Sequence, residues 1–163
     1  GRGGIHGWKD DRVRQLLMGE EVAPLTGRSL RAGVTEGELV VTNLTVGTHL
    51  IGTPWMPSLD GAILVLEDVG EAPYRVDRML THWRTAGLLQ NLAGIGLGHF
   101  RWKPDDVLPG DLSLEEVLED RLGDLGIPIV QGLPVGHGRP NKALPLGRRA
   151  RLDAQSGTLS VLS

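Results

Sequence analysis

The hydrophobic positions of the chain recur with two different periods, which separate helices from strands. A stripe of apolar residues at i, i+3, i+4 and i+7 spacing predicts a helix that begins at Pro73 and ends before Gly87. The stripe consists of Val76, Met79, Leu80 and Trp83. A capping box over residues 113–116 precedes a second apolar stripe, so we expect a further helix there that ends by Gly126.

The strongest strand signal is the continuous apolar run over 62–66, which is typical of a strand buried on both faces of an α/β sheet. Glu67 and Asp68 follow it, and we expect these two residues to close the strand. Residues 94–98 alternate glycine with apolar side chains and predict a closely packed strand. A shorter strand is expected over 127–130.

The remaining predicted elements are short. In chain order they are a helix over 10–17, a hairpin over 30–41, a helix over 44–51 capped by Asn43, and a closing hairpin of 148–153 with 158–162. Strands and helices therefore follow one another in a mixed order, which indicates the α/β or the α+β class. No domain boundary is visible after residue 20.

The composition narrows the classes of function. The chain has 163 residues, of which 40% are hydrophobic and 23% charged, as expected of a globular domain. Its formal charge of −3 argues against a nucleic-acid partner, and no run approaches the ~20 apolar residues of a membrane span. The absence of cysteine excludes disulfides and cysteine-ligated metals. The N-terminus lacks a signal-peptide core and starts with Gly1, so we expect a processed or excised chain.

Glu67 is the first candidate functional residue. Its carboxylate directly follows a buried strand, and the carboxyl ends of strands are where ligands bind in open α/β sheets. The alternative is that the strand simply emerges into water at this residue. The sequence pattern leaves both interpretations open.

His137 is the second candidate. Gly136 and Gly138 flank it, so the imidazole lies on a tight loop where the backbone can approach a ligand closely. A solvated loop histidine is the alternative. The other histidines have no partner pattern, and no histidine spacing typical of a metal site occurs. These other histidines are His6, His49, His82 and His99.

A nucleophilic serine and a cofactor loop are both missing from the pattern. None of the six serines stands in a Gly-x-Ser-x-Gly elbow, and Ser113 is already the cap of a helix. The glycines at 94, 96 and 98 lack the G-x-G-x-x-G spacing of a dinucleotide loop. The sequence pattern therefore supports neither a dinucleotide cofactor nor a metal site.

Long motifs of the chain resemble the L,D-carboxypeptidase family. They are LIGTPWMP over 50–57, GAILVLED over 61–68, EAPYRVDRML over 71–80, GLPVGH over 132–137 and LPLG over 144–147. The motifs occur in the same order as in the family. The resemblance runs from about Pro24 to the C-terminus and so covers most of the chain.

The resemblance implies a fold and a site. The family has an N-terminal domain with a nucleophilic serine and a C-terminal domain of the swivelling β/β/α type with a mixed sheet, to which residues 20–163 correspond. Residues 1–19 are then a remnant of the upstream domain or a linker from it, and 4–7 resemble the end of that domain. The catalytic Glu and His of the family map to Glu67 and His137, as members of a Ser–Glu–His triad.

The same resemblance implies a cytoplasmic hydrolase, often a homodimer, that works without a cofactor. Its substrate is the murein tetrapeptide of peptidoglycan recycling, from which it releases the terminal D-alanine. The partner of this chain is then a serine-bearing N-terminal domain that the chain does not contain.

One departure from the family concerns the substrate pocket. Val41 and Thr42 precede Asn43 where family members commonly have two glycines, and β-branched residues do not adopt a positive φ cheaply. With the missing serine, this departure keeps a non-catalytic dimerisation or ligand-binding module as an alternative. Cleavage of a peptidyl-nucleotide antibiotic, as in microcin-immunity relatives, is a second alternative. A catalytic role requires that folding brings Glu67 into contact with His137.

Overall fold

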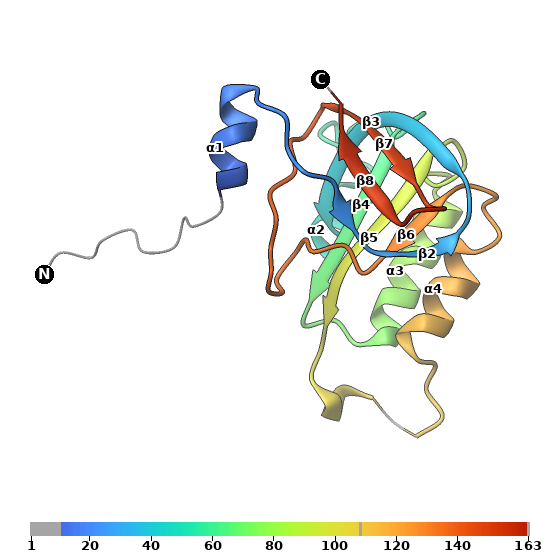
Figure 1. Cartoon of the computed structure of the whole chain (residues 1–163). Helices are drawn as coiled ribbons and strands as arrows, with labels where there is room; N and C mark the ends of the chain where they lie inside the picture. Colours follow the sequence, from blue (N-terminus) through green and yellow to red (C-terminus); the bar gives the residue numbers. More distant parts are fainter. Residues whose placement is uncertain (1–10, 108, 163) are drawn as a thin grey trace, which may run out of the picture.

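The computed structural model describes residues 11–107 and 109–162 (Figure 1). Within them, eight strands form one mixed sheet in the order β1-β8-β7-β3-β4-β5-β6-β2. Several expectations fall on residues 1–10, outside the described part: the segment that resembles the end of an upstream domain, His6, and the first residue of the helix predicted over 10–17.

The elements follow the chain in the mixed order that the sequence predicts. The strands are β1 Leu25–Thr26, β2 Arg28–Arg31, β3 Val34–Asn43, β4 Ile63–Val69, β5 Gly94–Arg101, β6 Ile129–Gln131, β7 Arg149–Asp153 and β8 Thr158–Val161. The helices are α1 Asp11–Met18, α2 Leu44–Leu50, α3 Pro73–Thr85 and α4 Leu114–Leu122, with a 3₁₀ turn at Pro104–Asp106. The sequence pattern does not indicate β1 or the 3₁₀ turn, because each spans only two or three residues.

Strand β3 belongs to both halves of the sheet. Its first half pairs antiparallel with β7, and its second half, up to Asn43, pairs parallel with β4. The predicted hairpin over 30–41 is therefore wrong, because β2 pairs with β6 at the far edge of the sheet. Gly33 has a φ of 137°, which only glycine adopts readily, and it lets the chain turn from β2 into β3 without pairing them. The closing hairpin of β7 and β8 is confirmed.

Two hydrophobic clusters separate three layers, which are the two halves of the sheet and the helices. One cluster joins residues from both halves of the sheet: Leu39, Ile63, Val65, Val130, Leu133, Ala150, Leu152 and Leu159. The other lies between the sheet and the helices: Leu64, Leu66, Val76, Leu80, Trp83, Ile95, Leu97, Val117, Leu118 and Leu122. Figure 1 shows α3 and α4 side by side along the sheet. This is the β/β/α arrangement predicted from the family resemblance, and it is confirmed.

Strand β4 is buried on both faces, as predicted. Ile63 and Val65 lie in the cluster within the sheet, whereas Leu64 and Leu66 lie in the cluster under the helices. Successive side chains of a strand point to opposite faces. The next two residues, Glu67 and Asp68, continue this alternation.

The helices form for the reasons that the sequence indicates. In α3, Val76, Leu80 and Trp83 are buried, and α4 begins with a complete capping box between Ser113 and Glu116. The part of the chain that the structure describes contains no helix with both the length and the apolar character that a membrane span requires.

The close approach of β3 and β4 generates a stability prediction. An alanine Cβ at Gly37 would collide with the carbonyl oxygen of Gly61 and lie 3.2 Å from the backbone nitrogen of Ile63. Backbone cannot move away cheaply, so we expect Gly37→Ala to lower the free energy of unfolding by about 1–3 kcal/mol. Denaturant unfolding measures this change. Val34→Ala, at an exposed position of the same strand, is the control, with an effect of about 0.5 kcal/mol or less.

Candidate functional site

Glu67 lies inside β4 rather than after it. The strand continues through Glu67 and Asp68 to Val69, so the expectation that these carboxylates close the strand is wrong. The Glu67 side chain is only 9% exposed, so the alternative that the strand emerges into water here is also wrong. The neighbours explain the burial, because β3 and β5 flank β4 and Asn43 stands opposite Glu67 in the register.

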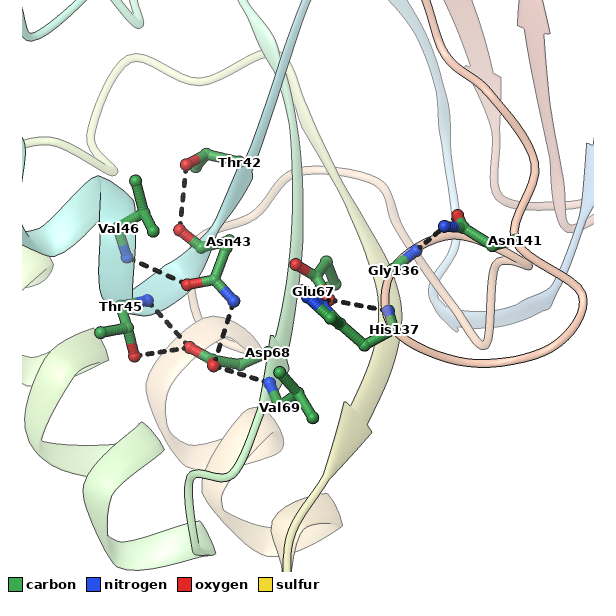
Figure 2. A network of polar contacts seen from close by, with 10 residues as sticks. All are labelled: Thr42, Asn43, Thr45, Val46, Glu67, Asp68, Val69, Gly136, His137 and Asn141. Carbon is green, nitrogen blue, oxygen red and sulfur yellow. Dashed lines mark hydrogen bonds and ion pairs between the residues drawn. The ribbon is translucent and has the colours of Figure 1, made fainter. Parts of the chain in front are cut away.

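The loop after β6 brings His137 onto this buried carboxylate. The Nδ1 atom of His137 lies 2.8 Å from Oε2 of Glu67, and the backbone N–H of His137 donates to the same oxygen at 3.1 Å (Figure 2). The two residues are separated by 70 positions in the sequence. The contact that a catalytic role requires is therefore present.

Two glycines make room for this contact. Gly136 has a φ of 102°, and a Cβ there would lie 2.7 Å from Cβ of Glu67 and 2.8 Å from its Cγ. A Cβ at Gly98 of β5 would lie 2.6 Å from the carbonyl oxygen of Val135 and 3.2 Å from Cβ of Glu67. The register of β4 and β5 shifts at this point, as in a β-bulge, and bulges commonly re-aim side chains next to sites.

The tautomer and the charge of His137 follow from its partner. An ionised carboxylate only accepts hydrogen bonds, so Nδ1 of His137 carries the hydrogen and Nε2 keeps a lone pair. The hydrogen bond to Glu67, and after it the charge of Glu67, raise the pKa of His137 above its ordinary value of 6.5. The charge of Asp68 acts in the same direction, whereas desolvation opposes it. The His137 side chain is 57% exposed, so its outer edge faces solvent.

Asn141 fixes the turn that presents His137. Its Oδ1 accepts the backbone N–H of Gly136 at 3.1 Å (Figure 2). The backbone N–H of Lys142 donates to the carbonyl oxygen of Pro134 at 2.7 Å, which ties the same segment to the other side of the loop. The sequence analysis missed Asn141, and its only signal was a short polar residue four positions after His137 in a loop rich in glycine and proline.

Asp68 organises the opposite face of β4. Its Oδ2 accepts both the backbone N–H and the hydroxyl of Thr45 at 2.8 Å, and its Oδ1 accepts Nδ2 of Asn43 at 3.1 Å (Figure 2). Asn43 caps α2 through the backbone N–H of Val46, as predicted. The buried carboxylate therefore locks the end of β3 and the start of α2 beside Glu67.

A cleft of about 350 Å³ opens over Glu67 and His137. Its walls are Val41, Thr42, Asn43, Val135, Gly136, Asn141, Lys142, Ala143 and Leu144. The described non-glycine residues all have negative φ, so Val41 and Thr42 simply extend β3 and need no glycine-like backbone. Val41 and Thr42 therefore form part of the cleft wall on an ordinary extended backbone.

The other candidates lie apart from this pair. His82 is exposed on α3, and His49 lines a separate cleft beside Arg75. His99 of β5 packs against Gly138, behind the loop. Of the described serines, none lines the cleft over Glu67, and Ser113 caps α4. Among the described residues, no group of three His, Asp or Glu side chains could hold a metal ion.

Residues 36–152 match the family described as the LD-carboxypeptidase C-terminal domain. A Synechocystis protein assigned as a carboxypeptidase is 51% identical over 155 residues, which cover 95% of this chain and 52% of that protein. The structure of a muramoyltetrapeptide carboxypeptidase from Oxalobacter formigenes has a TM-score of 0.81 at 33% identity, over 97% of this chain and 55% of that chain. The microcin C7 self-immunity protein of Escherichia coli is 28% identical over 94% of this chain and 46% of that protein. The chain thus spans about half the length of these relatives.

The contact between Glu67 and His137 predicts a pH dependence. His137 has a raised pKa in the folded state, so the pair stabilises the fold below pH 6.5, and this contribution is lost as the pH rises through the raised pKa. Glu67→Gln removes the charge and most of the hydrogen-bond strength, so we expect the pKa of His137 to fall. Titration of the His137 ring protons by NMR measures it.

A matched variant controls for the loss of a carboxylate. Glu71→Gln also removes one negative charge near the end of β4, but Glu71 pairs with Arg75 and does not contact His137. We expect Glu71→Gln to leave the His137 pKa unchanged. Equal pKa values in the native protein and the Glu67→Gln variant would contradict the contact.

Proposed function

The chain belongs to the LD-carboxypeptidase family, in which it corresponds to the C-terminal domain, and we propose that it supplies the Glu and the His of a Ser–Glu–His hydrolase site. The observation that supports this proposal is the 2.8 Å contact between Nδ1 of His137 and Oε2 of Glu67. In a serine hydrolase, the carboxylate holds the imidazole in the tautomer that accepts the nucleophile's proton.

The geometry gives each residue a role. Glu67 accepts the hydrogen of Nδ1 and stabilises the imidazolium that forms during the reaction. His137, with the lone pair of Nε2 on its exposed side, takes the proton from a serine hydroxyl and returns it to the leaving amine. The burial of Glu67 strengthens this electrostatic effect, because water screens the pair poorly from the carboxylate side.

Under this proposal, the nucleophilic serine lies outside the sequence of this chain. Among the described residues no serine lines the cleft over His137, and the chain spans about half of its relatives. We assign the serine to an N-terminal domain of the same protein, and we assign residues 1–19 to a remnant of that domain or to the linker that follows it. The exposed face of His137 is the side on which such a domain has to present its hydroxyl.

The proposed substrate is a murein tetrapeptide, from which the enzyme cleaves the terminal D-alanine during peptidoglycan recycling in the cytoplasm. The similarity to a muramoyltetrapeptide carboxypeptidase, at 33% identity and a TM-score of 0.81, supports this substrate class. We further propose that the whole protein is a homodimer and needs no cofactor. A stand-alone dimerisation or ligand-binding module is the non-catalytic alternative.

The similarity to the microcin C7 self-immunity protein favours a second candidate function, hydrolysis of a peptidyl nucleotide. The catalytic pair would be the same, so the two candidates differ only in the substrate. The murein peptide is preferred, because the TM-score to the carboxypeptidase structure is 0.81, whereas the TM-score to the immunity protein is 0.73.

The proposal predicts the effect of removing the imidazole. In an assembly of this chain with its serine-bearing domain, we expect His137→Ala to lower kcat for tetrapeptide hydrolysis by about 10⁴- to 10⁶-fold. Release of D-alanine measures the activity. His82→Ala, on the exposed face of α3, is the matched control and should retain full activity. Unchanged turnover in His137→Ala would contradict the proposal.

Substrate profiling separates the candidate functions. The intact assembly is offered a murein tetrapeptide and an aminoacyl sulfamoyl nucleoside at equal concentrations. We expect kcat/KM to be higher for the tetrapeptide. A preference for the nucleoside would support the immunity-type function instead, and no turnover of either compound would support the non-catalytic module.

A further inference from the structure

Arg12 is a buried charged residue on an otherwise peripheral helix. It is 6% exposed and is the one buried residue of α1, whereas Leu17 and Met18 of the same helix are exposed. Figure 1 shows α1 beside the sheet, away from the other helices. A buried guanidinium is costly unless its donors are satisfied, so its position calls for a specific set of acceptors.

Two acceptors of Arg12 come from distant segments of the chain. Its Nε donates to the carbonyl oxygen of Ala143 at 2.8 Å, across 131 positions of the sequence. One terminal nitrogen donates to the carbonyl oxygen of Ala23 at 2.5 Å. Arg12 therefore binds the wall of the cleft to the segment that leads from α1 into the sheet.

The wall that Arg12 holds is the one that controls His137. Residues 141–144 line the cleft, and Asn141 of this segment accepts the backbone N–H of Gly136. Gly136 in turn directs the backbone N–H of His137 to Glu67. A continuous path of hydrogen bonds and short chain segments thus leads from α1 to the catalytic pair.

We propose that Arg12 is a positioning residue, which fixes the wall 141–144 so that Asn141 keeps the turn at Gly136 in contact with Glu67. Its link to catalysis rests on the proposed function, whereas its effect on the contact between His137 and Glu67 does not. In this view α1 is part of the site's support, rather than a passive remnant of an upstream domain.

The test compares two arginines of α1 in the full chain. Arg12→Met keeps an apolar stem but removes the donors to Ala143 and Ala23. Arg14→Met is the control, because Arg14 is exposed and its ion pairs among the described residues are local, with Asp11 and Glu20. We expect Arg12→Met to lower the pKa of His137, but by less than Glu67→Gln lowers it. We also expect this variant to shift the amide resonances of Gly136 and His137. Arg14→Met should change neither.

The direction of the shift identifies its cause. Glu67 and Asp68 raise the pKa of His137, and the further charged or titratable groups of the surrounding segments include Lys142 of the wall, Arg139 of the same loop and His99 of β5. Loss of the Glu67 contact lowers the pKa of His137, whereas movement of the Lys142 cation away from the imidazole would raise it. A rise, or no change, in Arg12→Met would overturn the proposal.

A second variant keeps the test decisive if the first does not fold. Arg12→Lys retains the charge but cannot donate to both carbonyl oxygens in the fork geometry of arginine. It should show a smaller fall of the His137 pKa with thermal unfolding close to that of the native chain. An unchanged His137 pKa in a folded Arg12→Lys would also overturn the proposal. Neither measurement uses turnover, so a failed carboxypeptidase assay leaves this result readable.

Discussion

One carboxylate oxygen holds the candidate site together. Oε2 of Glu67 accepts two donors of the same residue, Nδ1 and the backbone N–H of His137. This pair of bonds fixes the ring and the backbone of the histidine at once. It also satisfies a carboxylate that is 9% exposed, and burial of this group without such donors would be strongly unfavourable. The positive φ of Gly136 and the lack of a side chain at the tightly packed Gly98 allow this contact, since a Cβ at either glycine would displace Glu67 or the loop.

The alternation of strand β4 divides two adjacent carboxylates between two tasks. Glu67 points to the same face as Ile63 and Val65, toward the loop of His137, whereas Asp68 points with Leu64 and Leu66 toward the helices. Asp68 uses its oxygens to lock Asn43 and the first turn of α2. The geometry of the cleft therefore depends on both residues, although only Glu67 contacts the imidazole.

Local patterns predict much of this arrangement. The stripe of α3, the capping box of α4 and the buried strand β4 are encoded within short windows, and the structure confirms them. The partner of β2 is a different case, because the choice between β3 and β6 depends on residues about 100 positions away. The residues around Glu67 likewise look like the end of a strand in the sequence. The strand continues because β3 and β5 pair with it on both sides, and these neighbours are distant in the sequence.

The residues of the candidate site also fall into two groups, those that the sequence reveals and those that only the folded structure reveals. Glu67 and His137 were accessible to sequence analysis, because each carries a local anomaly: an acidic residue on a buried strand and a histidine between glycines. Asn141 and Arg12 carry no such anomaly. Asn141 bonds the backbone N–H of Gly136 and Arg12 bonds the backbone carbonyl of Ala143, and every residue other than proline has both of these backbone groups, so the sequence does not reveal the contacts. The contact between Glu67 and His137 is thus complete within this chain, and internal hydrogen bonds set the orientation of the imidazole ring. Under the proposed function, a serine-bearing domain has only to bring its hydroxyl and its oxyanion donors to the exposed edge of an imidazole that is already aligned.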